Sequence, residues 1–145
     1  MTMHLTINAS ELGRGRGGNE TFIAGLIEGL AALPSPPETS LLTCEWDGVR
    51  SLPRSFNTVE LGPYRKFPFF VYQQTTALRR LEPDWYVSNY YLPPILPCRG
   101  AVIVHDLSFR VHPEWFPRSV AWYMRWLVGW AVHRAERVIT VSEFS

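Results

Sequence analysis

The apolar run AVIV at residues 101–104 constrains the fold of this chain more than any other stretch. It joins β-branched and small apolar residues without a polar interruption, which is typical of a strand buried on both faces of a parallel sheet. His105 and Asp106 follow it directly, before a loop at residues 107–117. Because ligands of open parallel sheets bind beyond the carboxyl ends of the strands, this pair is a candidate catalytic site.

Both members of the pair also have a purely structural interpretation. The His105 imidazole can hydrogen-bond a backbone carbonyl, and the Asp106 carboxylate can order the turn around Ser108. For either residue alone the two interpretations have equal weight. Two adjacent titratable groups beyond a buried strand favour a functional site.

Strand and helix patterns alternate along the rest of the chain. Apolar residues at helical spacing begin near Asn19, the predicted N-cap, and end before Pro34. A second helix is predicted from Pro68 to Glu82 and a third at residues 118–135. Strands are predicted at residues 4–7, 40–46, 57–61, 85–88, 101–104 and 137–141. This alternation predicts an α/β fold with a Rossmann-like, mostly parallel sheet and helices on both faces.

Length and charge narrow the possible functions. A chain of 145 residues has the size of one domain, and its formal net charge of +1 argues against nucleic-acid binding through phosphate neutralisation. The N-terminus lacks a signal-peptide pattern and no apolar run reaches membrane-spanning length. We therefore expect a cytoplasmic protein, with peripheral association at the inner membrane face left open. Cys44 and Cys98 have no metal-ligand spacing and are expected to be free thiols.

A glycine-rich loop lies between the first predicted strand and the first predicted helix. It contains Gly13, Gly15, Gly17 and Gly18, with Arg14 and Arg16 between them. Backbone N–H groups of such a loop and the helix dipole favour a closely bound anion, to which the arginines add charge. The spacing is neither that of a dinucleotide-binding fingerprint nor that of a P-loop, and a flexible surface loop is the alternative.

The loop after the fourth predicted strand carries Asn89, Tyr90 and Tyr91. Prolines later in this loop stiffen it, and tyrosine rings beside a site can stack on a ligand ring. Packing in the core is the commoner fate of such tyrosines, and it stays open as the alternative.

The predicted helix at residues 118–135 has two different faces. Its sheet-facing side is predicted to hold Val120, Met124, Leu127, Val128, Ala131 and Ala135. Its opposite side holds Arg118, Trp122, Arg125, Trp126, Trp130 and His133. A face that mixes tryptophan with arginine favours contact with a lipid headgroup region or with a partner protein. The alternative is that other parts of the polypeptide cover these tryptophans.

Three segments together resemble the N-terminal domain of glycosyltransferase family 4, whose retaining enzymes have two facing Rossmann-like domains, the GT-B fold. The segments are GRGRGGNETFIAGLIEGLAAL (13–33), PDWYVSNYYLPP (83–94) and VIVHDLSFRVHPEWFPRSVAWYMRWLVGWAVHRAERVITVSEFS (102–145). The third is the most specific of them. Only residues 34–82 carry little of the resemblance.

The resemblance implies transfer of a hexosyl group from a nucleotide sugar to an acceptor hydroxyl, with retained configuration, in cell-surface polysaccharide or glycolipid synthesis. It implies that Gly17 and Gly18 lie near the donor diphosphate, and that His105 and Asp106 lie near the transferred sugar and the carbohydrate or glycolipid acceptor. We expect Arg14 and Arg16 at the same diphosphate, and Asn89, Tyr90 and Tyr91 on the acceptor side of the site. Ser142 would lie at the rim of the cleft, with a helix N-cap as its alternative. No cofactor and no metal are expected, since the four histidines also lack metal-ligand spacing.

The family continues into a C-terminal domain that holds the nucleotide, and the printed sequence does not contain it. Residues 1–145 are therefore expected to form an incomplete, acceptor-side domain that is inactive alone. Two rivals stay open. One is a non-catalytic interaction or membrane-surface module that uses the Arg/Trp face of helix 118–135, and the other is a different Rossmann-type nucleotide binder.

Overall fold

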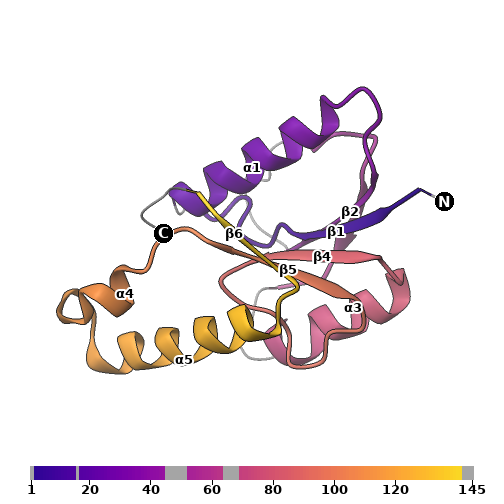
Figure 1. Ribbon diagram of the computed structural model, residues 1–145. Coiled ribbons are helices and arrows are strands. Elements are labelled where there is room, and N and C mark those ends of the chain that lie inside the picture. Colours follow the sequence, from indigo (N-terminus) through magenta and orange to yellow (C-terminus); the bar gives the residue numbers. More distant parts are fainter. Residues whose placement is uncertain (1, 16, 45–51, 64–68, 142–145) are drawn as a thin grey trace.

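The computed structural model describes residues 2–15, 17–44, 52–63 and 69–141 of the chain. Six strands form one sheet in the order β3-β2-β1-β4-β5-β6, and every neighbouring pair is parallel (Figure 1). The strands are β1 (His4–Asn8), β2 (Glu38–Thr43), β3 (Asn57–Glu60), β4 (Trp85–Asn89), β5 (Arg99–Val104) and β6 (Arg137–Thr140). This is a Rossmann-like α/β architecture, and the predicted fold class is confirmed.

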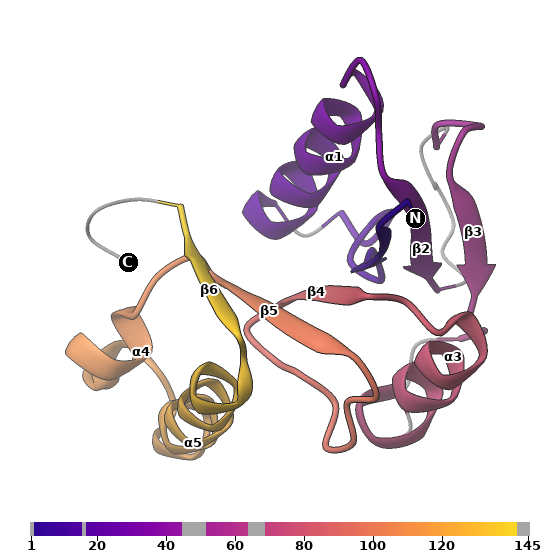
Figure 2. The ribbon, with the colours of Figure 1, turned by 45° about the vertical axis from the view of Figure 1, so that its right-hand side comes forward.

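Helices cover both faces of the sheet (Figure 2). Helix α1 (Gly18–Ala31) packs on one face, and α3 (Gln74–Leu81) and α5 (Arg118–Arg134) pack on the other. Shorter helical segments in the described part are the π-helical turn η1 (Phe69–Gln73), α4 (Ser108–Val111) and the 3-10 turn η2 (Pro113–Trp115). The two layers give the sheet two separate apolar cores.

Strand β5 is buried on both faces, as its sequence predicts. Ala101 and Ile103 face the α1 layer, and Val102 and Val104 face the layer of α3 and α5. Successive residues of a strand point to opposite faces, so a strand covered on both sides needs apolar residues at every position. None of the four is more than 4 % exposed. Strand β5 therefore packs against both helix layers, and its last residue fixes the position of His105.

Some predicted boundaries are wrong. Helix α1 has Gly17 as its N-cap, with φ of 63°, and Asn19 lies inside the first turn. The expected loop at residues 107–117 contains α4 and η2. Residues 45–46 of the second predicted strand and the predicted helix start at Pro68 lie outside the described residues.

Helix α5 buries nearly the face that its periodicity predicts. Leu127, Val128 and Ala131 are buried, but Val120 is 41 % exposed and Ala121 is buried instead. The start of α5 contacts α4 and η2, so these short segments, and not the sheet alone, decide which side of its first turns is covered. In the described parts of the chain, no helix combines the length and the apolar character needed to cross a membrane.

Strand β6 stands at one edge of the sheet. It pairs with β5 along one side, and among the described residues no strand pairs with its other side. Val138 and Ile139 are 44 % and 41 % exposed, although β-branched residues of this kind are typical of covered strands.

Candidate functional site

The carboxyl ends of the central strands meet where the strand order reverses. The chain builds β1, β2 and β3 outward in one direction and then returns to place β4, β5 and β6 on the other side of β1. Asn8 ends β1, Asn89 ends β4 and His105 follows β5. In open parallel sheets, a ligand crevice forms beyond the carboxyl ends at such a reversal.

His105 is held between aromatic rings from two other elements. Its ring lies 4.8 Å from the ring of Phe22 on α1, at an interplanar angle of 87°, and 5.5 Å from the ring of Tyr90. Its Nε2 atom lies 3.2 Å from the side-chain oxygen of Asn89. The residue is half-buried. The imidazole is therefore fixed by its neighbours and still reachable from outside.

The His105 ring is neutral at neutral pH. Burial lowers its pKa below the usual 6.5, and the negative charge of Asp106 offsets only part of this effect. Because Nε2 faces an amide oxygen as the Asn89 side chain is oriented, Nε2 carries the proton and donates it. A neutral imidazole in this position can exchange hydrogen bonds with a hydroxyl group without carrying charge.

Asp106 is exposed, and both of its carboxylate oxygens accept hydrogen bonds. Oδ1 accepts one from the Ser108 N–H at 2.9 Å and another from the Ser108 hydroxyl. Oδ2 accepts one from the Tyr90 hydroxyl at 3.2 Å. Burial works to raise the pKa of Asp106, but the hydrogen bonds from Ser108 and Tyr90 outweigh it and lower the pKa. The turn-ordering interpretation of Asp106 is thus confirmed, and its carboxylate stays ionised beside His105.

Tyr90 and Asn89 carry two features that are typical of functional sites. Tyr90 has a φ of 57°, a left-handed conformation that costs a non-glycine residue on the order of 1 kcal/mol. Burial, with a smaller effect of Asp106, raises the pKa of Tyr90 to about 12, so its hydroxyl remains a donor. The Nδ2 atom of Asn89 is buried and has no hydrogen-bond partner in the described structure. An unpartnered buried donor is unusual in folded proteins, and this one lies next to the His105 ring.

The glycine-rich loop opens at the same edge of the sheet. Positive φ angles occur at Gly13 (87°), Gly15 (65°) and Gly17 (63°). No heavy atom lies within 4 Å of the place where a Cβ would stand on Gly15, Gly17 or Gly18. Only glycine adopts these angles without strain, and the open backbone allows close approach of a ligand. Gly18 begins α1, whose Phe22 contacts His105, so one turn of helix connects the loop with the imidazole.

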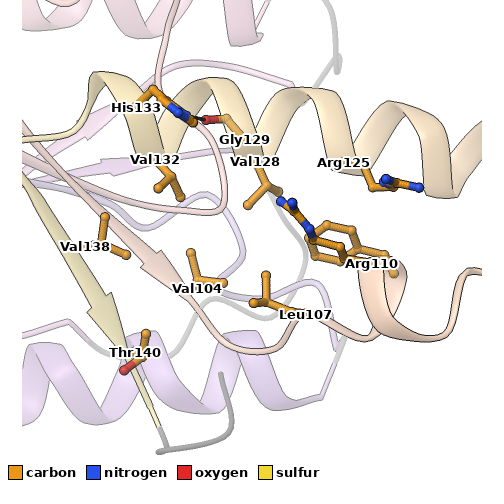
Figure 3. Close-up of a pocket in the computed structure, with 11 residues that line it drawn as sticks. Val104, Leu107, Arg110, Arg125, Val128, Gly129, Val132, His133, Val138 and Thr140 are labelled. Carbon is orange, nitrogen blue, oxygen red and sulfur yellow. Dashed lines mark hydrogen bonds between the residues drawn. The ribbon is translucent and has the colours of Figure 1, made fainter.

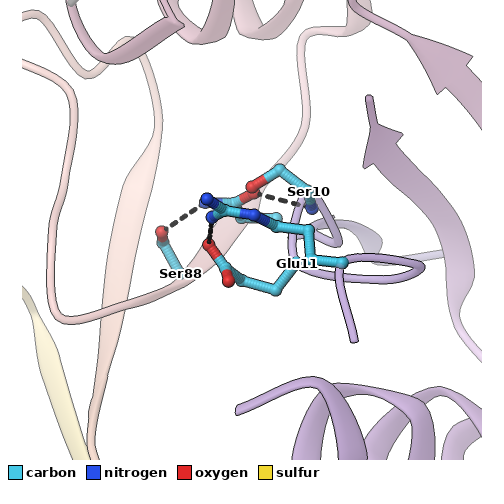
Figure 4. A network of polar contacts seen from close by, with 5 residues as sticks. Ser10, Glu11 and Ser88 are labelled. Atoms are coloured by element: carbon cyan, nitrogen blue, oxygen red, sulfur yellow. Dashed lines mark hydrogen bonds and ion pairs between the residues drawn. The ribbon is translucent and has the colours of Figure 1, made fainter. Parts of the chain in front are cut away.

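Arg14 lies in this loop and pairs with Glu11, which Figure 4 shows in a polar network with Ser10 and Ser88. Its Nη1 atom lies 2.6 Å from Oε1 of Glu11, and its side chain is only 11 % exposed. Asn8 donates to the Ser88 hydroxyl at 3.0 Å and accepts from the Ser10 N–H at 3.2 Å. The network ties the loop to the ends of β1 and β4. Glu11 neutralises Arg14, so Arg14 brings less positive charge to an anion than the sequence predicts.

The other predicted site residues divide into two groups. Tyr91 turns toward α5, where its hydroxyl lies 2.5 Å from the sulfur of Met124 and its ring lies 6.4 Å from that of Tyr123. It packs with the core, which is the alternative interpretation of these tyrosines. Arg16 and Ser142 lie outside the described residues.

Sequence reasoning missed the role of Phe22 at the site. Its spacing predicts an apolar residue on the first helix. That pattern does not predict that the Phe22 ring contacts His105. The only usable signal was its position in the first turn after the glycine loop, since helix starts in parallel sheets lie near the carboxyl ends of strands. Asn8 and Ser88, which link β1 to β4, were also missed.

No group of three or more His, Cys, Asp or Glu side chains within the described residues is arranged to hold a metal ion. Cys44 and Cys98 are free thiols, as predicted. Burial raises the pKa of each thiol to about 11, so both are protonated at neutral pH.

Comparisons of the chain with family models, with curated proteins and with solved structures found no match. The functional conclusion therefore depends on the residues and the geometry described above.

Proposed function

We propose that this chain is the acceptor-binding part of a retaining glycosyltransferase, which moves a sugar from a nucleotide sugar to an acceptor hydroxyl in cell-surface polysaccharide or glycolipid synthesis. The observation that carries the proposal is a neutral, half-buried imidazole at the reversal of strand order, one helical turn from an open glycine loop. The resemblance of residues 102–145 to glycosyltransferase family 4 supplies the class of reaction.

In this proposal the two parts of the site have different roles. The His105 imidazole hydrogen-bonds a sugar hydroxyl, because the ring is neutral and half-buried, and Asn89 holds the ring in place through Nε2. The N–H groups of the glycine loop and the dipole of α1 stabilise the charge of the donor diphosphate. Asp106 orders the loop through Ser108 and Tyr90 and keeps its negative charge beside His105. The leaving phosphate itself then assists the acceptor hydroxyl.

Binding is the property to test, because the family places the nucleotide site in a second domain. The 145-residue chain is applied to an array of immobilised oligosaccharides and glycolipids, and UDP-glucose and GDP-mannose are titrated by calorimetry. We expect His105→Ala and His105→Phe to weaken acceptor binding about tenfold, which corresponds to one lost hydrogen bond of about 1.4 kcal/mol. His105→Phe keeps a ring against Phe22 and Tyr90 and so separates hydrogen bonding from packing.

The matched control is His133→Ala, on the exposed side of α5, which should leave acceptor binding unchanged. The proposal fails if no sugar on the array binds, or if both His105 variants bind as tightly as the unaltered chain. Binding of UDP or GDP with no contribution from the sugar supports a different Rossmann-type nucleotide binder instead.

A further inference from the structure

One face of the molecule joins exposed tryptophans and arginines. We call it the Trp–Arg face, and its members are Arg110 of α4, Trp115 of η2, and Arg118, Trp122, Arg125 and Trp126 of α5. Trp115, Trp122 and Trp126 are 67 %, 69 % and 60 % exposed, and all three arginines are exposed. Tryptophan is mostly buried in folded proteins, so three exposed indoles on adjoining elements mark a contact surface. Of the three tryptophans predicted on this side of α5, Trp122 and Trp126 are not covered by other described parts of the chain, whereas Trp130 is half-buried and packs against the core.

The charge of this face is one-sided. Residues 107–135 contain four arginines and one acidic residue, Glu114, a formal net charge of +3 in a chain whose total is +1. Glu114 lies 3.0 Å from Nδ1 of His112 and makes no ion pair with an arginine. Among the described residues, Arg110, Arg118 and Arg125 take part in no ion pair. The face therefore presents guanidinium groups whose charge no neighbouring carboxylate cancels.

The face is hollowed between its aromatic and basic side chains. A hollow of about 380 Å³ is lined by Arg110, Trp122, Arg125 and Trp126. Arg110 and Arg125 also border an apolar cavity of about 210 Å³ between α5 and β6, whose lining includes Val104, Leu107 and Val138 (Figure 3). Cationic groups thus stand beside both indole rings and an apolar recess, which is the arrangement that an anionic amphiphile needs.

We propose that the Trp–Arg face docks on a bilayer that contains anionic phospholipid. Indole rings favour the boundary between headgroups and acyl chains, and arginines favour the negative surface of such a bilayer. A helix that carries both along one side lies in the plane of the interface. Since the described chain has no helix able to cross a membrane, the contact is peripheral. The proposal does not depend on the glycosyltransferase assignment, and it uses none of the residues placed at the candidate site.

The test is flotation of the 145-residue chain with vesicles. Vesicles of phosphatidylcholine alone are compared with vesicles that hold three parts phosphatidylglycerol to seven parts phosphatidylcholine. We expect binding to the anionic vesicles only, and loss of at least tenfold in partition for Arg118→Glu with Arg125→Glu, because each basic residue near such a surface contributes about a factor of five. Trp122→Ala with Trp126→Ala should lower binding as well. It should also reduce the blue shift of tryptophan emission on vesicle addition.

Matched controls lie on α3 and on η1, away from this face. Arg79→Glu with Arg80→Glu makes the same change of charge, and Tyr72→Ala removes another exposed aromatic ring, which is 65 % exposed. Both controls should float like the unaltered chain, and circular dichroism checks that every variant is folded. Equal flotation of the Trp–Arg variants and the unaltered chain overturns the proposal, as does equal binding to uncharged vesicles. Competition by inorganic phosphate at millimolar concentration would assign the face to free phosphate. Self-association without flotation, if Trp122→Ala with Trp126→Ala abolishes it, would assign the face to a protein contact.

Discussion

The charge of single side chains gives the sharpest test of the candidate site. The pKa of His105 is lowered by burial and raised in part by Asp106, so we expect its NMR titration midpoint below 6.5. Asp106→Asn removes the negative charge and should lower this midpoint further. Glu136→Gln is the control, since Glu136 precedes β6 at the amino ends of the strands, far from His105. A midpoint above 6.5, or one that rises in Asp106→Asn, contradicts the described surroundings of the ring.

The lowered pKa of His105 also makes the free energy of unfolding depend on pH. A histidine whose pKa is lower in the folded state binds more protons when the chain unfolds, so the free energy of unfolding rises with pH in this window. The contribution of His105 is complete above pH 6.5 and is lost as the pH falls through 6.5 toward the folded-state value. His105→Phe should remove this part of the pH dependence in urea unfolding.

Only some of the site residues could be predicted from the sequence. His105 and Asp106 could be found because both follow a buried strand, and local sequence identifies such a strand. Asn89 and Tyr90 were also predicted as site residues, but their contacts with His105 were not. Phe22 was missed because it reaches His105 through packing across the sheet. The pairing of Arg14 with Glu11 was equally hidden, since sequence shows that both charges exist and not which way they point.

At the scale of elements, two glycines should respond in opposite ways to the same substitution. A Cβ on Gly100 of β5 would stand 2.6 Å from Leu96 and 3.1 Å from Leu92, and Leu92 is buried. We expect Gly100→Ala to destabilise the chain by about 1–3 kcal/mol through overpacking. Gly29 of α1 has open space at that point, so Gly29→Ala should stabilise by up to about 1 kcal/mol. Urea unfolding measures both, and a stable Gly100→Ala variant would show that the loop of Leu92 and Leu96 yields easily.

Gly100 also shows that the ends of helices and strands could not be predicted from the sequence. A glycine before an apolar run is typical of a turn, yet β5 begins at Arg99 and includes Gly100. The reason is that Arg99 and Gly100 pair with Trp85 and Tyr86 of β4, which no local pattern reveals. Helix and strand types were predictable from periodicity, whereas ends depended on contacts between elements. The burial of Ala121 in place of Val120 has the same cause.

At the scale of the molecule, the α/β class and the parallel sheet followed from alternating patterns, which are local. The order β3-β2-β1-β4-β5-β6 did not, because sequence periodicity carries no record of which strands become neighbours. That order decides the site, since it places the ends of β1, β4 and β5 side by side. The candidate residues were therefore predictable one by one, and their assembly was not.

Strand β6 forms an exposed, apolar edge of the sheet. Val138, Ile139 and the following Val141 are 44 %, 41 % and 44 % exposed, and in the described chain the outer side of β6 has no pairing strand. An uncovered, apolar edge strand is a template for pairing with another chain. We expect the 145-residue chain to self-associate with rising concentration in sedimentation velocity, and Ile139→Lys to suppress this by placing a charge at the edge. Leu33→Lys is the control, because Leu33 is similarly exposed, at 46 %, but lies beyond the end of α1. If Leu33→Lys suppresses association as strongly as Ile139→Lys, general hydrophobicity and not the strand edge drives it.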